Sequence, residues 1–518
     1  MTPRRRDRFQ SRLRKTVWVA ILIVLVPVSA NLAAWRSVLD TAPSSSPRPP
    51  VFDPPGATEQ PREGEPPSGL HSDAGGDTHT ASSDVTSPSG ETTWRLVGSN
   101  TLGEKLVPAW LDAFVSTQGG RITGRIVEDR YHRLFKLAGP SELPPAVQIS
   151  AHGDGTAFVD LGAGRADIAM ASRRVSDRET ARLVMLGDMR SPDAEHIVAM
   201  DGIAILVNPD NPIMSVSLEQ VAAIYRCKIT DWAQLGGPPG PIKLYARNPE
   251  SGTYSLFSQL IMKNAPLCRR VIYFESSEML SQRIRDDRDA IGFTSLAYGD
   301  QAKALAIEQC GIAYPPDPFS VKNESYPLSR RLYLYVPPRN PRPVSRAFLR
   351  WVQTEEAQDI ARRLGFVDLN IISVQGTEPT HQQRLSAAGR LTKNPEILAQ
   401  YRRLTTQARR LSSTFYFDFG LVSLDNRAKR DLLRLADYLR DLEAAGPEVI
   451  VLGFTDDHGD YTQNLHLSRI RAETVARELR RLGVQVAEAR GFGEEAPAAC
   501  NQRRRDRVRN RHVEVWLR

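Results

Sequence analysis

Asp456 and Arg471 are an acid and a base whose spacing would let them grip one ligand. Asp456 lies in a polar stretch that follows an apolar run, and Arg471 lies on a segment with helical spacing. A carboxylate that faces a guanidinium across a shallow cleft can hold a ligand carrying both an ammonium and a carboxylate group. A lone Asp/Arg pair is more often an ordinary surface salt bridge, so the neighbouring residues must decide between the two interpretations.

Two predicted elements would position this pair. The apolar run at 449–452, rich in β-branched residues, ends at Gly453 and predicts a strand. After the polar loop 455–459, apolar residues recur at helical spacing: Leu467, Ile470, Val475, Leu479 and Leu482. The pattern predicts strand, loop and helix, with Asp456 leaving the strand and Arg471 on the helix.

The motifs around the pair keep one order within residues 412–518: GFTD at 453–456, Asn464, LS at 467–468, RA at 471–472, GFGE at 491–494 and NR at 510–511. This order resembles the OmpA-like peptidoglycan-binding domain, a small α+β fold. In that family, the residues that match Asp456 and Arg471 hold the amino and carboxylate groups of diaminopimelate in the cell wall. The resemblance implies that these two residues grip the same ligand here, and that Asn464 and Arg511 shape the pocket. His512 stands where family members often have a second arginine.

A second group of polar residues would suit a small anion. The sequence SGT at 251–253 opens a predicted helix, where free N–H groups and the helix dipole favour negative charge. Arg247 ends the preceding strand and would add a bidentate fork. Thr101 and the pair at 155–156 open two further helices, and three such ends converging from two lobes would enclose an anion. Taken alone, Ser-Gly-Thr is more often a helix N-cap.

The elements around these residues alternate between strand-like and helix-like apolar runs from Trp94 onward, which predicts α/β units. The strand 202–207 is expected to open a second lobe, and the chain is expected to return to the first lobe near 326–335.

Several motifs keep one order from Trp94 to Asp368: GSNT at 98–101, DIAMASR at 167–173, DGIA at 201–204, ITDW at 229–232, SGT at 251–253 and AIGF at 290–293. Together they resemble the phosphate-binding proteins of ABC transporters, a periplasmic-binding-protein fold of two α/β lobes joined by a hinge. The resemblance and the residue types together give the predicted anion-binding residues: Thr101, Leu102, Gly155, Thr156, Ser172, Arg247, Ser251, Gly252 and Thr253.

Two positions depart from that family. Its phosphate binders have an aspartate, which accepts the proton of hydrogen phosphate, where this chain has Arg173. The glycine-rich turn at Gly153 often offers serine, and here it offers Asp154. Arg173 would add anion affinity, and Asp154 would either take over the acceptor role or point to solvent. The prediction is therefore a small oxyanion, with phosphate as the first candidate; a larger ligand and a vestigial pocket stay open.

The first forty residues hold most of the net charge of +8, so the globular part needs no basic face and no nucleic-acid partner is predicted. The uncharged run 16–35 behind this basic head predicts an uncleaved membrane anchor, or else a signal peptide cleaved near 28–30. We favour the anchor; in both cases the bulk of the chain is exported to the periplasmic side of the envelope.

The predicted domain order follows from these segments. It is a basic head with anchor or signal segment (1–40), a disordered Pro/Ser/Gly linker (41–92), a two-lobed phosphate-binding-protein-like domain (93–372), a partly helical connector (373–411) and an OmpA-like domain (412–518). The basic stretch 503–509 is expected to be a solvated turn.

The remaining residue types give no support for catalysis. The sequence has no metal-ligand spacing and no nucleophile elbow, so we predict no enzyme activity, metal or cofactor. Of the cysteines, Cys227, Cys268 and Cys310 lie in the second lobe and could supply one disulfide, with Cys500 in another domain.

These observations predict an exported, envelope-anchored solute-binding protein that captures an oxyanion, is tethered to peptidoglycan and could serve an ABC permease. The alternative is a structural protein that bridges the inner membrane and the cell wall, with a middle domain that takes no part in transport.

Overall fold

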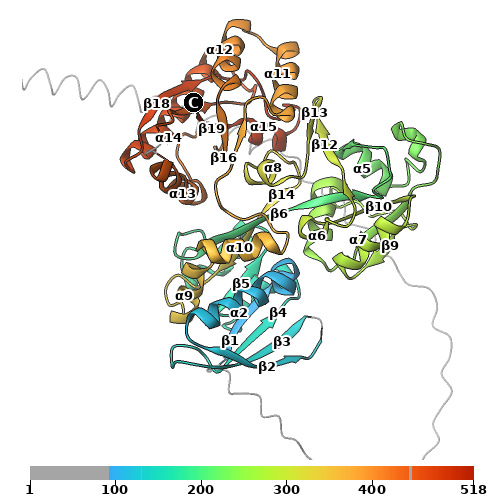
Figure 1. Ribbon diagram of the computed structural model, residues 1–518, viewed down its shortest axis with the longest axis vertical. Coiled ribbons are helices and arrows are strands. Elements are labelled where there is room, and N and C mark those ends of the chain that lie inside the picture. Colours follow the sequence, from blue (N-terminus) through green and yellow to red (C-terminus); the bar gives the residue numbers. More distant parts are fainter. Residues whose placement is uncertain (1–92, 130, 443–445) are drawn as a thin grey trace, which may run out of the picture. The chain divides into compact units, whose positions relative to one another are not determined.

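The computed structural model describes residues 93–129, 131–442 and 446–518 (Figure 1). The predicted anchor or signal segment at 1–40 and the predicted linker at 41–92 lie outside these residues. Within the described ranges, no helix is both long enough and apolar enough to cross a membrane.

The first lobe is built on a mixed sheet. Strands β4, β1 and β5 run parallel, as the alternation of strand and helix predicts, and β14 returns antiparallel between β5 and β6. The elements of this lobe are β1 Thr93–Gly98, the π-turn Leu102–Leu106, α2 Val107–Thr117, β2 Arg121–Val127, β3 His132–Ala138, β4 Ala146–Ser150, α3 Asp154–Gly162, β5 Ile168–Ala171, α4 Asp177–Arg182, the 3₁₀ turn Val184–Leu186, β14 Ser329–Tyr335, α9 Pro343–Trp351 and α10 Glu355–Arg363.

The second lobe extends the same sheet through β10, β8 and β9 and adds a small sheet of β13, β12 and β7. Its elements are β7 Ser215–Ser217, α5 Leu218–Tyr225, the 3₁₀ turn Trp232–Leu235, β8 Lys243–Arg247, α6 Gly252–Phe257, the π-turn Ser258–Met262, β9 Ile272–Phe274, α7 Ser277–Asp286, β10 Ala290–Ser295, the 3₁₀ turn Leu296–Tyr298, β11 Lys303–Ala304, β12 Ala306–Gln309, β13 Ile312–Tyr314 and α8 Pro318–Lys322.

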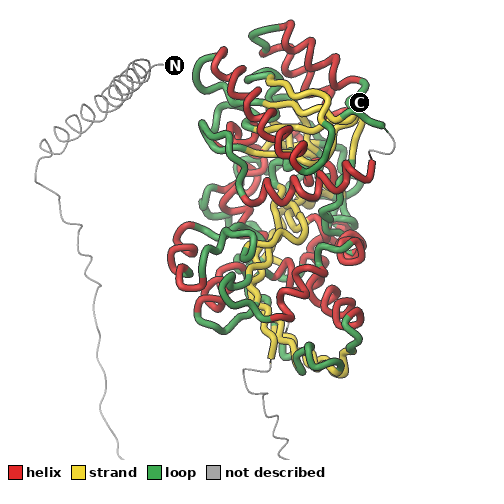
Figure 2. The backbone as a smooth tube through the Cα atoms, turned by 90° about the vertical axis from the view of Figure 1, so that its left-hand side faces the viewer, coloured by secondary structure: helices red, strands yellow, loops and turns green. Residues whose placement is uncertain are grey.

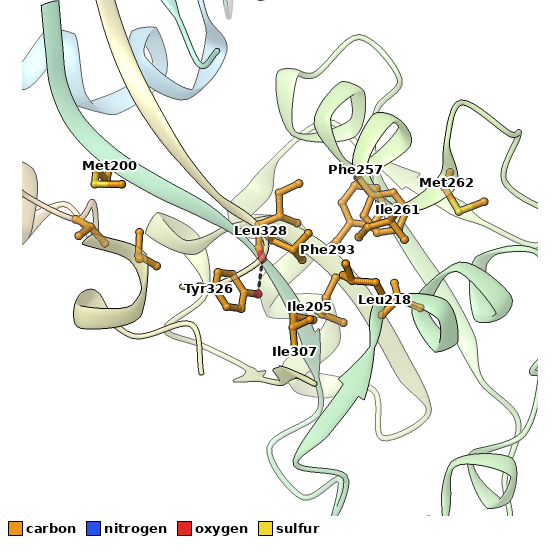
Figure 3. Packing of buried hydrophobic residues seen from close by; sticks show 14 of the residues in the cluster. Met200, Ile205, Leu218, Phe257, Ile261, Met262, Phe293, Ile307, Tyr326 and Leu328 are labelled. Atoms are coloured by element: carbon orange, nitrogen blue, oxygen red, sulfur yellow. Dashed lines mark hydrogen bonds between the residues drawn. The ribbon is translucent and has the colours of Figure 1, made fainter. Parts of the chain in front are cut away.

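Strand β6 (Glu195–Val207) belongs to both lobes, because its first half pairs with β14 and its second half pairs with β10. Its apolar residues on both sides of Asp201 allow burial on both faces. Below it, Tyr326 donates a hydrogen bond to the carbonyl of Ile203 at 2.7 Å, within a buried apolar cluster that includes Phe257 and Phe293 (Figure 3). The hinge of the two-lobed fold is therefore a packed pair of strands rather than a loose loop.

The C-terminal part is a sheet in the order β15-β16-β19-β17-β18, and Figure 2 shows its strands in yellow beside red helices. The expected connector 373–411 forms β15, α11, α12 and the start of β16, and β15 pairs with β16 in this sheet. The elements are β15 Ser373–Gln375, α11 Pro379–Leu391, α12 Pro395–Thr406, β16 Arg409–Tyr416, α13 Asn426–Leu442, β17 Val449–Gly453, α14 Tyr461–Arg481, β18 Val486–Gly491, α15 Arg504–Asn510 and β19 His512–Leu517.

Two disulfides join the cysteines. Cys227 bonds to Cys268 inside the second lobe, which is one of the pairs that the sequence allowed. Cys310 bonds to Cys500 across 190 positions and links the second lobe to the C-terminal domain, a pairing that the sequence did not indicate.

The basic stretch 503–509 differs from the solvated turn expected for it. Most of it forms α15, and Arg503 forms an ion pair with Glu219 on α5. Arg509 donates hydrogen bonds to the Gln309 side chain and to the Ser325 carbonyl. These arginines are used for contacts inside the protein because Cys500 brings the stretch beside the second lobe.

Candidate functional site

Three hydroxyl side chains from two lobes meet at one buried guanidinium. Arg330 on β14 donates hydrogen bonds to Thr101 Oγ1 at 3.1 Å and to Ser172 Oγ at 3.4 Å. It also donates to Thr253 Oγ1 at 3.4 Å, and this residue comes from the second lobe. All four residues are at least nine-tenths buried. Residues of both lobes therefore meet in one buried polar cluster.

Asp201 on β6 holds this guanidinium in place. Its Oδ2 accepts from Arg330 Nε at 2.9 Å and from Nη2 at 2.6 Å, while Oδ1 accepts from Ser295 Oγ at 2.9 Å. Asp201 is fully buried. A buried charge needs a partner and further hydrogen bonds, and this ion pair supplies both groups with them.

Asp154 takes an acceptor position beside Ser172. Its carboxylate accepts from the Ser172 amide at 3.0 Å and from the Ser172 hydroxyl at 2.7 Å. Gly252 of the opposite lobe lies next to both groups, because a Cβ built on it would approach Ser172 Oγ to 3.2 Å and Asp154 Oδ1 to 3.9 Å. The absence of a side chain at Gly252 allows the two lobes to come this close.

Two residues of the predicted anion loop, Arg247 and Ser251, form hydrogen bonds within the second lobe instead of with Arg330. Arg247, at the end of β8, donates to Ser277 Oγ and, at 2.8 Å, to the carbonyl of Glu275. Ser251 is the N-cap of α6, since its hydroxyl accepts from the Tyr254 amide at 3.0 Å. Arg247 and Ser251 therefore shape the loop that carries Gly252 and Thr253.

Three other predicted residues do not reach Arg330 in the described part of the chain. Leu102 is fully buried in the apolar core of the first lobe. Gly155 is exposed, and Thr156 donates its hydroxyl to the carbonyl of Gly153 at 3.0 Å. The structure thus brings Thr101, Ser172 and Thr253 together at Arg330. Leu102 lies in the apolar core, and Gly155 and Thr156 lie outside the cluster.

Arg173 does not face the cleft cluster. Its guanidinium forms a bidentate contact with Glu179 at 2.8 and 2.7 Å, and these hydrogen bonds raise the pKa of Arg173. It also lies over the ring of Phe158. An anion that bound Arg173, as the sequence suggested, would therefore compete with Glu179 for its guanidinium.

In the C-terminal domain, Asp456, Arg471 and Arg511 form a buried charged cluster. Asp456 Oδ2 accepts from Arg511 Nη1 at 2.8 Å. Arg471 donates to the carbonyls of Leu421 at 3.0 Å and Asp418 at 3.2 Å. Burial, followed by the charge of Arg511, lowers the pKa of Arg471 to about 10, and the charge of Asp456 opposes this shift. The predicted acid and base thus lie in one electrostatic neighbourhood, with Arg511 as the direct partner of the acid.

Asn464 fixes the loop beside this cluster. Its amide donates to the carbonyl of His458 at 3.1 Å and to Glu494 Oε2 at 3.1 Å. The loop 457–459 is therefore tied to α14, which also carries Arg471.

Arg330 and Asp201 are the residues that sequence reasoning missed. Arg330 shares a strand face with Leu332 and Leu334, both fully buried, because side chains alternate along a strand. Asp201 interrupts the apolar run of β6. A single charge at a buried position of a strand was the available signal, since such charges are almost always paired.

Comparison with known proteins adds two family matches. Residues 141–356 match the model of the PBP superfamily domain, and residues 416–511 match the OmpA family. The chain is 30% identical over 236 residues to protein SphX of Synechococcus elongatus, which covers 43% of this chain and 69% of that protein. It is 30% identical over 241 residues to phosphate-binding protein PstS of Pseudomonas aeruginosa, covering 43% of this chain and 74% of the relative.

A solved structure, the peptidoglycan-associated lipoprotein from Burkholderia pseudomallei, is similar to part of this chain. It is 32% identical, and the match covers 20% of this chain and 89% of that chain with a TM-score of 0.19.

Proposed function

Because the chain belongs to the family of PBP-superfamily proteins that includes PstS and SphX, and carries an OmpA-family domain after it, we propose that it captures a small oxyanion at the cell envelope. Phosphate is the first candidate, since PstS is named for binding it. The C-terminal domain would tether the protein to peptidoglycan, and the segment 1–40 would hold it on the periplasmic side of the inner membrane. An ABC permease would receive the ligand.

The observation that carries the oxyanion proposal is the convergence of Thr101, Ser172 and Thr253 on one buried guanidinium. Hydroxyl donors that are gathered from two lobes and shielded from water can replace the hydration of an oxyanion. Domain closure around such a ligand is a common mode of capture in two-lobed binding proteins.

Calorimetric titration of the full chain with phosphate, sulfate and a small organic phosphate tests this function. We expect saturable binding of at least one of them, with a rise in Tm at saturation because the ligand binds only the folded state. Arg247→Ala should weaken binding tenfold or more, at about 1.4 kcal/mol for each factor of ten, because the loop 251–253 loses its support. Arg270→Ala, an exposed arginine of the same lobe, is the control. Absence of heat and of stabilisation with all three anions would reject the proposal.

The buried cluster of Asp456, Arg471 and Arg511 supports the tether. A carboxylate and two guanidinium groups in one cluster have the charges that complement a ligand with an ammonium and a carboxylate. We expect Asp456→Asn, which keeps the shape of the side chain, to release the protein from purified sacculi in a sedimentation assay, and Arg471→Ala to do the same. Arg480→Ala, on the exposed face of the same helix, should sediment as the parent protein does. Retention of both site variants would exclude this cluster as the wall-binding site.

A further inference from the structure

The contacts of Arg330 fix the direction in which two hydroxyl groups can donate. An arginine side chain has only donors, whereas a threonine hydroxyl has one donor and two acceptor positions. Because Arg330 Nη2 donates to Thr101 Oγ1 and Thr253 Oγ1, each threonine uses an acceptor position toward Arg330. Their own hydrogens must therefore point away from the guanidinium.

Those hydrogens have no acceptor among the residues that the structure describes. Ser172 differs, since its hydroxyl donates to Asp154. Thr101 and Thr253 are 8% and 1% exposed, so water reaches neither of them freely. A buried hydroxyl that cannot donate loses a hydrogen bond that it makes in water, and this favours an occupant with acceptor atoms.

The position of Arg330 ties this arrangement to lobe closure. Arg330 is on β14 and its partner Asp201 is on β6, the two strands that pair at the hinge. Thr101 belongs to the first lobe and Thr253 to the second lobe, so one guanidinium contacts both only when the cleft is closed.

We propose that Arg330 is a positioning residue of the oxyanion site, which turns the hydroxyl hydrogens of Thr101 and Thr253 toward the bound ligand when the lobes close. This inference rests on the proposed function of the cleft. Asp201 keeps the guanidinium at this position and neutralises its charge, so Arg330 acts through the two threonines rather than by charge alone. The group that fits is an ionised oxygen, which only accepts hydrogen bonds.

A double-mutant cycle on the full chain tests this role, with titration of inorganic phosphate as the readout. Arg330→Lys keeps the charge and loses the planar guanidinium, whose Nε and Nη2 hold Asp201 while Nη2 contacts both threonines. We expect Arg330→Lys and Thr253→Val each to weaken phosphate binding about tenfold or more. The double variant should be within about threefold of the weaker single variant, because valine removes the hydroxyl that Arg330 orients. A merely structural role would make the two losses multiply.

The control is Arg331→Lys, on the neighbouring position of the strand, where the side chain pairs with Glu324 and Asp431 instead. It should leave phosphate affinity unchanged. Wild-type affinity in Arg330→Lys, or multiplying losses in the double variant, would overturn the positioning role while the oxyanion function stands. If the parent protein binds no phosphate, sulfate or organic phosphate, the function and this inference fall together. Should Arg330→Lys not fold, wild-type affinity in both Thr101→Val and Thr253→Val would overturn the inference.

Discussion

Two histidines of the C-terminal domain lie in surroundings that disfavour their protonated form. Burial lowers the pKa of His512 to about 4, even though Glu514 accepts a hydrogen bond from its ring. Burial, with the nearby charge of Arg384, lowers the pKa of His381 to about 3. Both side chains are therefore neutral in the folded protein across the physiological range, while an unfolded histidine titrates near pH 6.5.

The free energy of unfolding should consequently depend on pH. Folding lowers both pKa values. As the pH falls below about 6.5, the two histidines therefore bind protons in the unfolded chain but stay neutral in the folded chain. The stabilisation is complete above that pH. It is lost from about pH 6.5 down to about pH 4 for His512 and about pH 3 for His381, with a slope of up to about 1.4 kcal/mol per pH unit for each histidine. Urea unfolding at several pH values measures this slope.

His381→Gln should make that slope shallower, because it removes one group whose pKa folding lowers. His466→Gln, at an exposed position of α14, is the matched control and should leave the slope as it is. An unchanged slope in His381→Gln would show that this histidine does not contribute to the acid sensitivity.

At the scale of elements, α14 packs against β17 and β18 through glycines. A Cβ on Gly453 would overlap the carbonyl oxygen of Ser468, and one on Gly491 would overlap Arg469 N and Ser468 Oγ. The helix backbone thus rests directly on the two strands. This close approach sets the distance from the strand end that carries Asp456 to the helix that carries Arg471, and so defines the predicted wall-binding cleft.

Gly491→Ala should destabilise the C-terminal domain by about 1–3 kcal/mol, because the methyl group pushes α14 away from β18. It should also weaken sedimentation with sacculi, since the cleft widens. Gly389→Ala is the matched control: it lies within α11, where an added Cβ meets no atom within 4 Å. There alanine should raise stability by up to about 1 kcal/mol through helix propensity. Thermal unfolding measures the expected loss of stability in Gly491→Ala and the expected gain in Gly389→Ala. A Gly491→Ala variant as stable as the parent protein would contradict the packing argument.

At the scale of the whole molecule, the Cys310–Cys500 disulfide connects the second lobe to the C-terminal domain. It closes a loop of 190 positions, whereas Cys227–Cys268 closes 41 positions inside one lobe. Tyr314 adds a hydrogen bond to the carbonyl of Ala498 at 2.5 Å beside the longer link. The polar contacts of Arg503 and Arg509 lie next to the same disulfide.

Replacement of Cys310 and Cys500 by serine should lower Tm by the equivalent of about 2–4 kcal/mol, because the unfolded chain regains loop entropy. We also expect the calorimetric transition to split, since the C-terminal domain then unfolds independently of the second lobe. The paired variant Cys227→Ser with Cys268→Ser should lower Tm without such a split. A single transition in the Cys310/Cys500 variant would contradict coupling through the disulfide.

Local spacing determined several elements of this protein from the sequence alone. The amphipathic run 426–442 predicts a helix that the structure has at Asn426–Leu442, and the run 449–452 predicts strand β17. The family matches at 141–356 and 416–511 confirm the two resemblances drawn from ordered motifs. Such patterns are readable because period and turn chemistry act between neighbours in the chain.

Tertiary structure alone decided which distant residues meet. Arg330 contacts Thr101 across 229 positions, Arg511 contacts Asp456 across 55, and Cys310 bonds to Cys500 across 190. Strand order and lobe closure set these contacts, and residue spacing carries no record of them. For that reason Thr101, Ser172 and Thr253 could be proposed from the sequence, while the buried guanidinium of Arg330 that contacts their hydroxyls could not.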